Sequence, residues 1–320
     1  MGEISMMKIH EEKLAQYKNR FRLCSIIVKL PLLACPILLV SLIGWFLSWG
    51  KVNFIFLILL VLMGSAAFML AKHQEKLCED ADRYVSENMF RPIVARDVVI
   101  SLFETNGVIE RQKLENASIF PNNRDYVIGK SHFNGIVNNF QIEYFDFVSY
   151  SRYGTYRNIS YGRKGHFAIL TTDCDVNGYC TIRPSKKSKK AIDKVFDKML
   201  GKETPIKLTT GNKDFDSCYT ITTNYPENFE KILTSELIDI FLKHKKDKRH
   251  IHYLEFRDNM IYIFLENDIW GFAMDPDEEY RRTLVNRNAL WGAKDAGEVD
   301  ARLHENWGIM MQLINALPSL

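Results

Sequence analysis

Two histidines separated by one residue are the most metal-like feature of the sequence. Alternate residues of a β-strand point to the same face, so His250 and His252 are spaced to present both imidazoles to one ion. Glu255 and Asp258 follow closely as further oxygen ligands, which makes a metal-dependent hydrolase one hypothesis. No Cys or second His-x-His pair has a matching spacing, so we predict two solvated histidines and no bound metal.

Two cysteines flank a predicted hairpin turn. Cys174 and Cys180 enclose Asp-Val-Asn-Gly-Tyr, so their thiols are expected to approach each other across the turn. A redox pair or half of a zinc site needs further ligands or a lowered thiol pKa, and the sequence shows neither. The six cysteines include no Cys-x-x-Cys pair, so we expect free thiols in a reducing compartment.

Two basic clusters are candidates for binding an anionic surface or a protein partner. They are Lys186, Lys187, Lys189 and Lys190, and then Lys243, Lys245, Lys246, Lys248 and Arg249. The second cluster closes a predicted helix, where the helix dipole favours cations, but the first opens one, where it does not. Beside an anionic membrane, each Lys near the surface contributes about 1 kcal/mol. We therefore predict lipid or partner contact at these clusters; solvated helix ends are the alternative.

No recognised catalytic motif accompanies these candidates. The sequence has no phosphate-binding Gly-rich loop, nucleophile-elbow Ser, zinc-protease His-Glu pair or kinase signature. We therefore assign no catalytic residues and expect a protein without enzymatic activity or cofactor.

Two apolar segments near the N-terminus determine the expected fold class. Residues 25–48 and 53–70 are each about long enough to cross a hydrocarbon core of roughly 30 Å. The few residues between them require antiparallel neighbouring helices. We predict a membrane protein with two transmembrane helices and a cytoplasmic α+β domain.

The charges around these segments predict their orientation. Basic residues precede the first segment and follow the second, namely Lys13, Lys18, Arg20 and Arg22, then Lys72, Lys76 and Arg83. The connecting loop has only Lys51, so the positive-inside rule places both termini in the cytoplasm. The first 71 residues carry seven Lys or Arg against three Glu, which leaves the remaining 249 residues at −1. Nucleic-acid binding is therefore excluded as a main function.

The pattern of the remaining sequence predicts the domain organisation. We divide the chain into a basic N-terminal helix (1–24), a transmembrane hairpin (25–71), a helical stalk (72–118), an α+β domain (119–275) and a C-terminal loop and helix (276–320). Strands are predicted at 126–130, 135–150, 166–172, 179–183, 206–210, 217–222, 251–256, 260–266 and 269–273, and helices at 73–104, 185–200, 227–244 and 299–317. Strands joined by short turns favour a mainly antiparallel sheet.

Several segments taken together resemble a known family. They are Tyr126-Val-Ile-Gly-Lys-Ser-His-Phe-Asn-Gly, Gly165-His-Phe-Ala-Ile-Leu, Thr210-Gly-Asn-Lys-Asp-Phe-Asp-Ser-Cys-Tyr-Thr-Ile-Thr-Thr-Asn, Phe229 with Ile232-Leu-Thr-Ser-Glu-Leu-Ile, and Phe256-Arg-Asp-Asn-Met-Ile-Tyr-Ile. With the two-span hairpin, they resemble the bacterial family named domain of unknown function 3137. The sequence departs from the family at Ala168, where the basic residue and Gly usual after the strand Phe are absent.

The resemblance implies a location and a partner but no catalytic residues. It implies a bacterial inner (cytoplasmic) membrane protein and a partner resembling the LemA-type membrane proteins. Our leading hypothesis is a membrane-anchored adaptor or scaffold whose cytoplasmic domain binds a protein and anionic lipid. The alternatives are a membrane-bound metal-dependent hydrolase and an oligomeric pore-forming effector gated by the cytoplasmic domain. A homo-oligomer is compatible with each.

Overall fold

The computed structural model forms two compact units. One contains Met1–Asn88 and Pro276–Ala301, and the other contains Met89–Asp275 and Arg302–Leu320. The structure describes residues 2–49, 54–105, 107, 113, 117, 125–152, 159–173, 178–185, 206–227, 232–246, 250–266 and 295–317. The helix predicted at 185–200 and the strand predicted at 269–273 lie outside these residues. We call the first unit the hairpin unit and the second the sheet unit.

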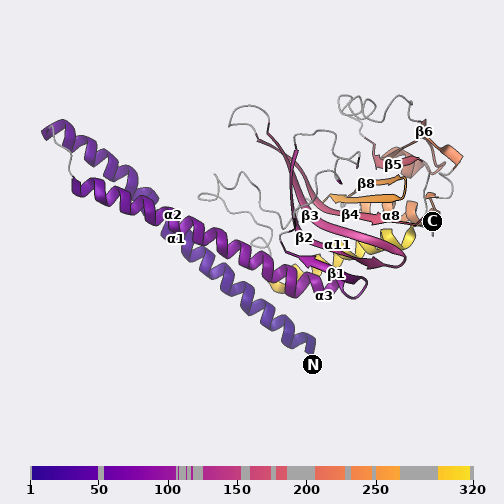
Figure 1. Ribbon diagram of the computed structural model, residues 1–320, viewed down its shortest axis with the longest axis horizontal. Helices are drawn as coiled ribbons and strands as arrows, with labels where there is room; N and C mark the ends of the chain where they lie inside the picture. The colour runs from indigo at the N-terminus through magenta and orange to yellow at the C-terminus, as the bar shows by residue number, and fades with distance from the viewer. Residues whose placement is uncertain are drawn as a thin grey trace. The chain divides into compact units, whose positions relative to one another are not determined.

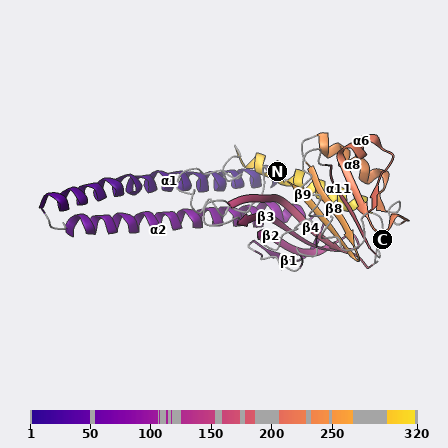
Figure 2. The same ribbon diagram turned by 90° about the horizontal axis from the view of Figure 1, so that it is seen from above.

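Two long helices dominate the hairpin unit (Figure 1). They are α1 (Gly2–Trp49) and α2 (Phe54–Val85), which lie side by side as antiparallel neighbours (Figures 1 and 2). The predicted basic N-terminal helix and the first predicted span are thus one continuous helix. Both helices are, by length and composition, long and apolar enough to cross a membrane.

The two helices pack through a seam with heptad spacing. Leu14, Phe21 and Val28 are seven residues apart on α1, and all three are buried. Residues at this spacing face a partner helix in a left-handed coiled coil. On α2, Gln74 Nε2 donates to Ser25 Oγ at 2.8 Å. The packing therefore continues along parts of both helices that lie outside the most apolar segments.

The helical stalk predicted after the second span is shorter than expected. The chain continues from α2 through the π-helical turn η1 (Ser86–Phe90) and the short helix α3 (Arg91–Val94). Residues 99–104 then form strand β1 (Val99–Glu104), so the helix predicted over 73–104 is wrong in its last part. The β-branched residues Val98, Val99 and Ile100 stand at its start, and β1 pairs with residues that lie 28 to 37 positions further along the chain.

An antiparallel sheet forms the core of the sheet unit, as predicted. Its nine strands, counted in the described part of the chain, have the order β1-β2-β3-β4-β9-β8-β5-β7-β6 (Figure 1). The remaining strands are β2 (Asp125–Val137), β3 (Phe140–Arg152), β4 (Ile159–Thr171), β5 (Tyr179–Pro184), β6 (Ile206–Leu208), β7 (Tyr219–Thr223), β8 (His250–Arg257) and β9 (Met260–Glu266). Every adjacent pair is antiparallel.

A short helix shifts one predicted strand. The strand predicted at 217–222 begins two residues later, because α6 (Lys213–Cys218) occupies the preceding positions. Asn212 caps this helix, and its side-chain oxygen accepts the backbone N–H groups of Asp214 and Phe215 at 3.1 and 3.2 Å. The capping residue therefore overrides the strand pattern locally.

The helix predicted at 227–244 is interrupted near its middle. Residues 227 and 232 are helical, residues 233–234 are not, and α8 runs over Ser235–Lys246. The hydroxyl of Thr234, immediately before α8, accepts the backbone N–H of Leu237 at 3.2 Å. This N-terminal cap marks the start of α8 after the interruption.

Aromatic residues fill both faces of the sheet. On one face, Phe133 and Tyr144 have ring centroids 4.8 Å apart, and Trp307 of the last helix, α11 (Ala296–Ala316), lies 5.8 Å from Tyr144. On the other face, Phe145 and Phe167 stack at 5.3 Å within a buried cluster. Each fully buried aromatic contributes about 1.5–3 kcal/mol by leaving water, so both faces hold the strands in register.

Candidate functional site

A buried polar cluster interrupts the aromatic packing beside Trp307. It consists of Tyr144 and Asp146 on β3 and His166 on β4. Asp146 and His166 are direct cross-strand partners, and Tyr144 lies two residues before Asp146. Residues two apart on a strand share a face, so all three side chains point to the same side of the sheet.

The three side chains form a closed triangle of short contacts. The Tyr144 hydroxyl donates to Asp146 Oδ1 at 2.8 Å and lies 2.7 Å from His166 Nδ1. His166 Nδ1 is 2.5 Å from the same Asp146 oxygen. Burial raises the pKa of Tyr144 well above its ordinary value, and the Asp146 charge raises it further. The tyrosine therefore stays protonated and serves as a donor.

The arrangement resembles a histidine oriented by a carboxylate. In catalytic and metal sites such a contact orients the ring, and the other nitrogen acts on the substrate or ion. Here His166 Nε2 and Asp146 Oδ2 are buried and have no hydrogen-bond partner among the residues that the structure describes. The His166 side chain is only 3% exposed, so a substrate has no direct access to it. We assign the cluster to the internal packing of the sheet.

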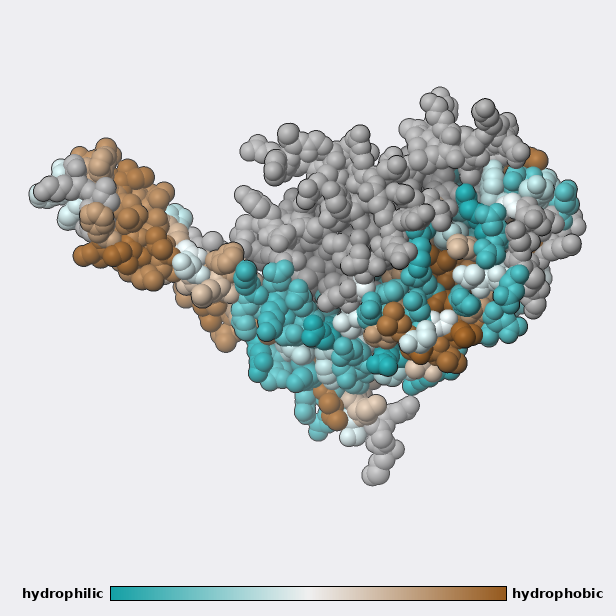
Figure 3. All heavy atoms as spheres, viewed as in Figure 1, coloured by the Kyte–Doolittle hydropathy of each residue, from teal (hydrophilic) through white to brown (hydrophobic). Residues whose placement is uncertain are grey.

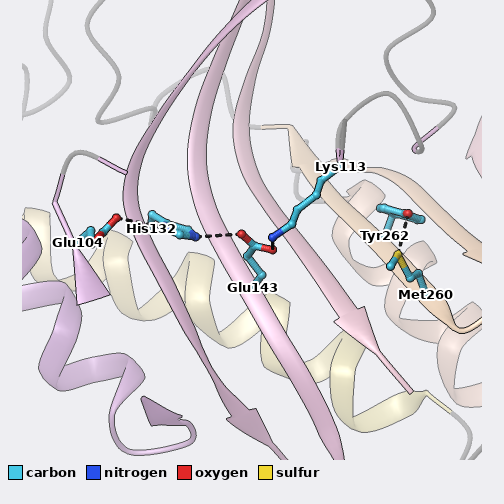
Figure 4. Close-up of polar contacts among 6 residues, drawn as sticks. All are labelled: Glu104, Lys113, His132, Glu143, Met260 and Tyr262. Carbon is cyan, nitrogen blue, oxygen red and sulfur yellow. Dashed lines mark hydrogen bonds and ion pairs between the residues drawn. The ribbon is translucent and has the colours of Figure 1, made fainter. Parts of the chain in front are cut away.

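A second polar chain crosses β1, β2 and β3 on the opposite face (Figure 4). His132 lies between two carboxylates, with Nε2 3.0 Å from Glu143 Oε1 and Nδ1 3.5 Å from Glu104 Oε2. Lys113 Nζ donates to the other oxygen of Glu143 at 2.6 Å. Figure 4 shows the four side chains in one row, so opposite charges alternate along it.

The charges in this chain reinforce one another. The hydrogen bond to Glu143 raises the pKa of His132; burial opposes this, and Glu104 adds to it. Burial alone would raise the pKa of Glu143, but hydrogen bonds from His132 and Lys113 outweigh it and lower that pKa. Both imidazole nitrogens face carboxylates, so neither has a lone pair left for a metal or a substrate. This row of side chains therefore links strands β1, β2 and β3 through electrostatic contacts.

Comparison with known proteins gives a family but no activity. Residues 164–317 match the sequence model of a family described as protein of unknown function (DUF3137). Just under half of the chain is therefore similar to the DUF3137 family. No curated protein and no solved structure matches the chain. The resemblance predicted from sequence is thus confirmed, although the segment beginning at Tyr126 precedes the matched residues.

The His250–His252 pair lies in β8, at a point where the strand is irregular. The register with β9 shifts between Ile251 and Tyr253, which interrupts the simple alternation on which the metal hypothesis depends. The two imidazoles lie outside the described side chains. No group of three His, Cys, Asp or Glu residues able to hold a metal occurs in the described part of the chain.

The carboxylate proposed to assist these histidines has another partner. Glu255 is fully buried, and Arg257 Nε donates to its Oε1 at 2.7 Å. The Tyr253 hydroxyl also donates to Glu255. A carboxylate tied to a guanidinium and a hydroxyl is a poor candidate for a metal ligand, because binding would break both contacts.

The structure describes only part of the predicted basic clusters. Residues 186–190 lie outside the described residues, as do Lys248 and Arg249. Lys245 and Lys246 lie in the last turn of α8. Lys243 on the same helix has an exposed side chain. The prediction that these clusters bind lipid or a partner stays a prediction.

The cysteine prediction is only partly described. Cys174 lies outside the described residues, whereas Cys180 on β5 is 2% exposed. Burial raises the pKa of the Cys180 thiol to about 12, and the Glu255 charge contributes. A thiol that remains protonated at neutral pH is a poor nucleophile, so Cys180 is a packing residue.

Sequence analysis missed both polar clusters. Asp146 stands within a run of apolar strand residues and His166 directly precedes one, and a polar residue on the buried face of a central strand is the signal that was available. The partners cannot be paired without the strand register, which places residue 146 opposite residue 166.

Proposed function

We propose that the chain is a membrane-anchored binding protein, whose helices α1 and α2 cross a bilayer and whose sheet unit binds a protein partner. The observation that supports this most is the exposure of the apolar helix surface. The 18-residue windows of highest hydropathy are only 12% and 0% buried. A core helix of a soluble protein buries such a segment, and these helices do not.

The exposed side chains are large and lie close together. Leu47 and Phe54 expose 78% and 71% of their surface, and Val40 exposes 68%. Figure 3 shows a largely hydrophobic surface over this part of the hairpin unit, with some polar residues at its tip. Each Å² of apolar surface left in water costs about 25 cal/mol, and soluble proteins rarely expose patches of this extent. A bilayer removes that cost.

Basic flanks support an orientation with both termini in the cytoplasm. Lys13, Lys18, Arg20 and Arg22 precede the first apolar segment, whereas the loop between the helices has only Lys51. In this orientation the sheet unit and the basic clusters lie on the side of the inner membrane of a bacterium that carries anionic lipid. The clusters then add lipid contact to the anchoring.

A binding role agrees with the chemistry of the described residues better than the two alternatives. Among the described residues, the two histidines that contact carboxylates are poor candidates for a hydrolase, because His166 is buried and His132 is occupied by two carboxylates. The pore hypothesis needs a polar stripe along the helices. The hydroxyls of Ser41, Ser48 and Ser65 instead donate to carbonyl oxygens of their own helix at 2.8–2.9 Å.

Thiol labelling tests the membrane topology. Lys51→Cys and Met6→Cys variants are expressed in bacteria, converted to spheroplasts and treated with a membrane-impermeant maleimide, with the parent protein as the background control. We expect labelling of Lys51→Cys in intact spheroplasts and of Met6→Cys only after lysis. Equal labelling of both variants, or extraction of the protein by alkaline carbonate, would contradict the proposal.

Affinity purification of the full chain in mild detergent tests the partner. We expect a second protein in constant ratio, and the family resemblance suggests the LemA type. A variant in which Lys243, Lys245 and Lys246 are changed to Gln is purified in parallel. The amount of second protein that it retains shows whether the second basic cluster contributes to binding. A chain that crosses the membrane but retains no second protein would contradict the binding role alone.

A further inference from the structure

The open sheet has one edge strand able to accept another strand. β1 lies at one end of the strand order, and β2 is the strand that pairs with it among those described (Figure 1). The other edge strand, β6, has three residues against six in β1. A longer edge strand offers a row of main-chain N–H and C=O groups on its outer side, which favours pairing with another chain.

Apolar side chains are exposed along the same edge. Val99 and Ile136 are cross-strand partners and expose 74% and 53% of their surface. Leu102, which pairs with a residue two positions from Ile136, exposes 42%. The three residues therefore share one face of the sheet. No Lys or Pro within Val99–Glu104 protects this edge against pairing.

We propose that β1 is an interface for a second copy of this chain, paired antiparallel across a two-fold axis near Ser101. An antiparallel pair of identical strands is self-complementary, so a two-fold axis through the strand centre satisfies both copies at once. The pairing extends the sheet across the dimer. It also brings the exposed side chains of Val99 and Leu102 in one copy close to the apolar residues of β1 in the second copy.

The charges at the two ends of β1 favour a second copy of this chain as the partner. Arg96 is exposed just before the strand, and Glu104 at its end has a half-exposed side chain. With the axis near Ser101, Glu104 lies opposite residue 98 of the second copy, so Arg96 of that copy is a diagonal neighbour of Glu104 and its long side chain can reach the carboxylate. Asp97, also near the start, already accepts the Trp307 indole N–H at 2.8 Å. Its charge is thus directed toward α11.

A bulge limits the length of the new ladder. The register with β2 shifts between Ile100 and Leu102, and the Ser101 hydroxyl donates to the Asn134 carbonyl oxygen at 3.0 Å. A bulge bends an edge strand and shortens its pairing. We therefore expect a modest interface that depends on the apolar contacts beside it. The proposal concerns the sheet unit and does not depend on the hairpin crossing a membrane.

Native mass measurement of the full chain in mild detergent tests the interface. We expect a dimer for the parent and a monomer for the double variant Val99→Glu with Leu102→Glu. The matched control is Ile206→Glu on the opposite edge strand, where Ile206 is 45% exposed; it should remain dimeric. A monomeric parent, or a double variant that keeps both its melting temperature and its dimer mass, would overturn the proposal.

Charge reversal and crosslinking keep the test decisive if the double variant misfolds. Arg96→Glu alone should weaken the dimer about fivefold, and adding Glu104→Arg should restore it. Ser101→Cys should crosslink between copies in membranes under mild oxidation, whereas Ile206→Cys should not. Failure of both the rescue and the crosslink overturns the interface. The maleimide labelling is independent, so either proposal can fail while the other stands.

Discussion

The two polar clusters of the sheet unit use similar groups in opposite ways. The triangle of Tyr144, Asp146 and His166 is sealed from water, with the Asp146 and His166 side chains 0% and 3% exposed. The row through His132 alternates charges and ends at Glu104, whose side chain is 50% exposed. A histidine and a carboxylate meet in both. The difference lies in how much solvent is left to replace a lost partner.

This difference predicts unequal consequences of mutation. A buried charge that loses its partner keeps its desolvation cost, whereas a half-exposed charge recovers most of the loss from water. The triangle should therefore be sensitive to every substitution and nearly insensitive to salt. The row should respond weakly to single substitutions but visibly to pH.

The largest effect is expected for Asp146→Asn. The amide removes the charge that both Tyr144 and His166 contact, and it leaves polar groups in a sealed site. We expect a loss of about 3 kcal/mol in the stability of the sheet unit, measured as a shift of the denaturant midpoint in detergent. The control is Asp258→Asn in the exposed β8–β9 turn, which should lose less than about 0.5 kcal/mol. Equal losses in both variants would show that the buried contacts of Asp146 stabilise the sheet unit no more than an exposed aspartate does.

A smaller loss is expected for Tyr144→Phe. The ring and its contacts with Phe133 and Trp307 remain, and only the hydroxyl that donates to Asp146 is removed. We expect a loss of about 1–2 kcal/mol. Tyr225→Phe, at a position 42% exposed, is the matched control and should be close to neutral. A neutral Tyr144→Phe would mean that His166 alone satisfies the carboxylate.

The sequence predicted the sheet better than the clusters within it. Alternating strands and short turns are local signals, and the β8–β9 hairpin appears with its turn at Asp258, which has the left-handed φ of 52° that Asp tolerates. The family resemblance also came from continuous segments. Features of this kind need no knowledge of which strands are neighbours.

Features that depend on distant neighbours were missed. Strand β1 was predicted as the end of a helix, because the apolar stripe of the preceding residues was extended past Pro92 to residue 104. In the fold it approaches Gly135 so closely that a Cβ there would lie 2.5 Å from Val98 Cγ1 and 2.7 Å from the Val99 carbonyl oxygen. The glycine that makes room for β1 lies in another strand. No local pattern near residue 99 contains that information.

The next largest effect is expected in how the stability of the sheet unit depends on pH, which involves the row through His132. The folded pKa of His132 is raised above its ordinary 6.5, so its contribution to stability is complete below 6.5 and lost as pH rises through the raised value. The pKa of Glu143 is lowered from 4.5, so its contribution is complete above 4.5 and lost as pH falls through the lowered value. The row therefore stabilises the sheet most between these limits.

His132→Gln tests this window. The variant should lose about 1 kcal/mol at pH 6, less at pH 9, and its midpoint should vary less with pH than that of the parent. His73→Gln, at an exposed position of α2, should leave the pH profile unchanged. A variant that follows the parent at every pH would show that His132 is not protonated in the fold.

The smallest effect is expected for Glu104→Gln, at the solvated end of the row. Its carboxylate is 3.5 Å from His132 Nδ1, a weaker contact than the 3.0 Å one on the Glu143 side. We expect a loss below about 0.5 kcal/mol that disappears in high salt, because exposed charges are screened. Glu143→Gln, in the partly buried centre of the row, should lose more and keep most of that loss in salt. If the two variants lost stability equally, exposure would not decide the strength of these contacts, and the contrast between the row and the sealed triangle would need another cause.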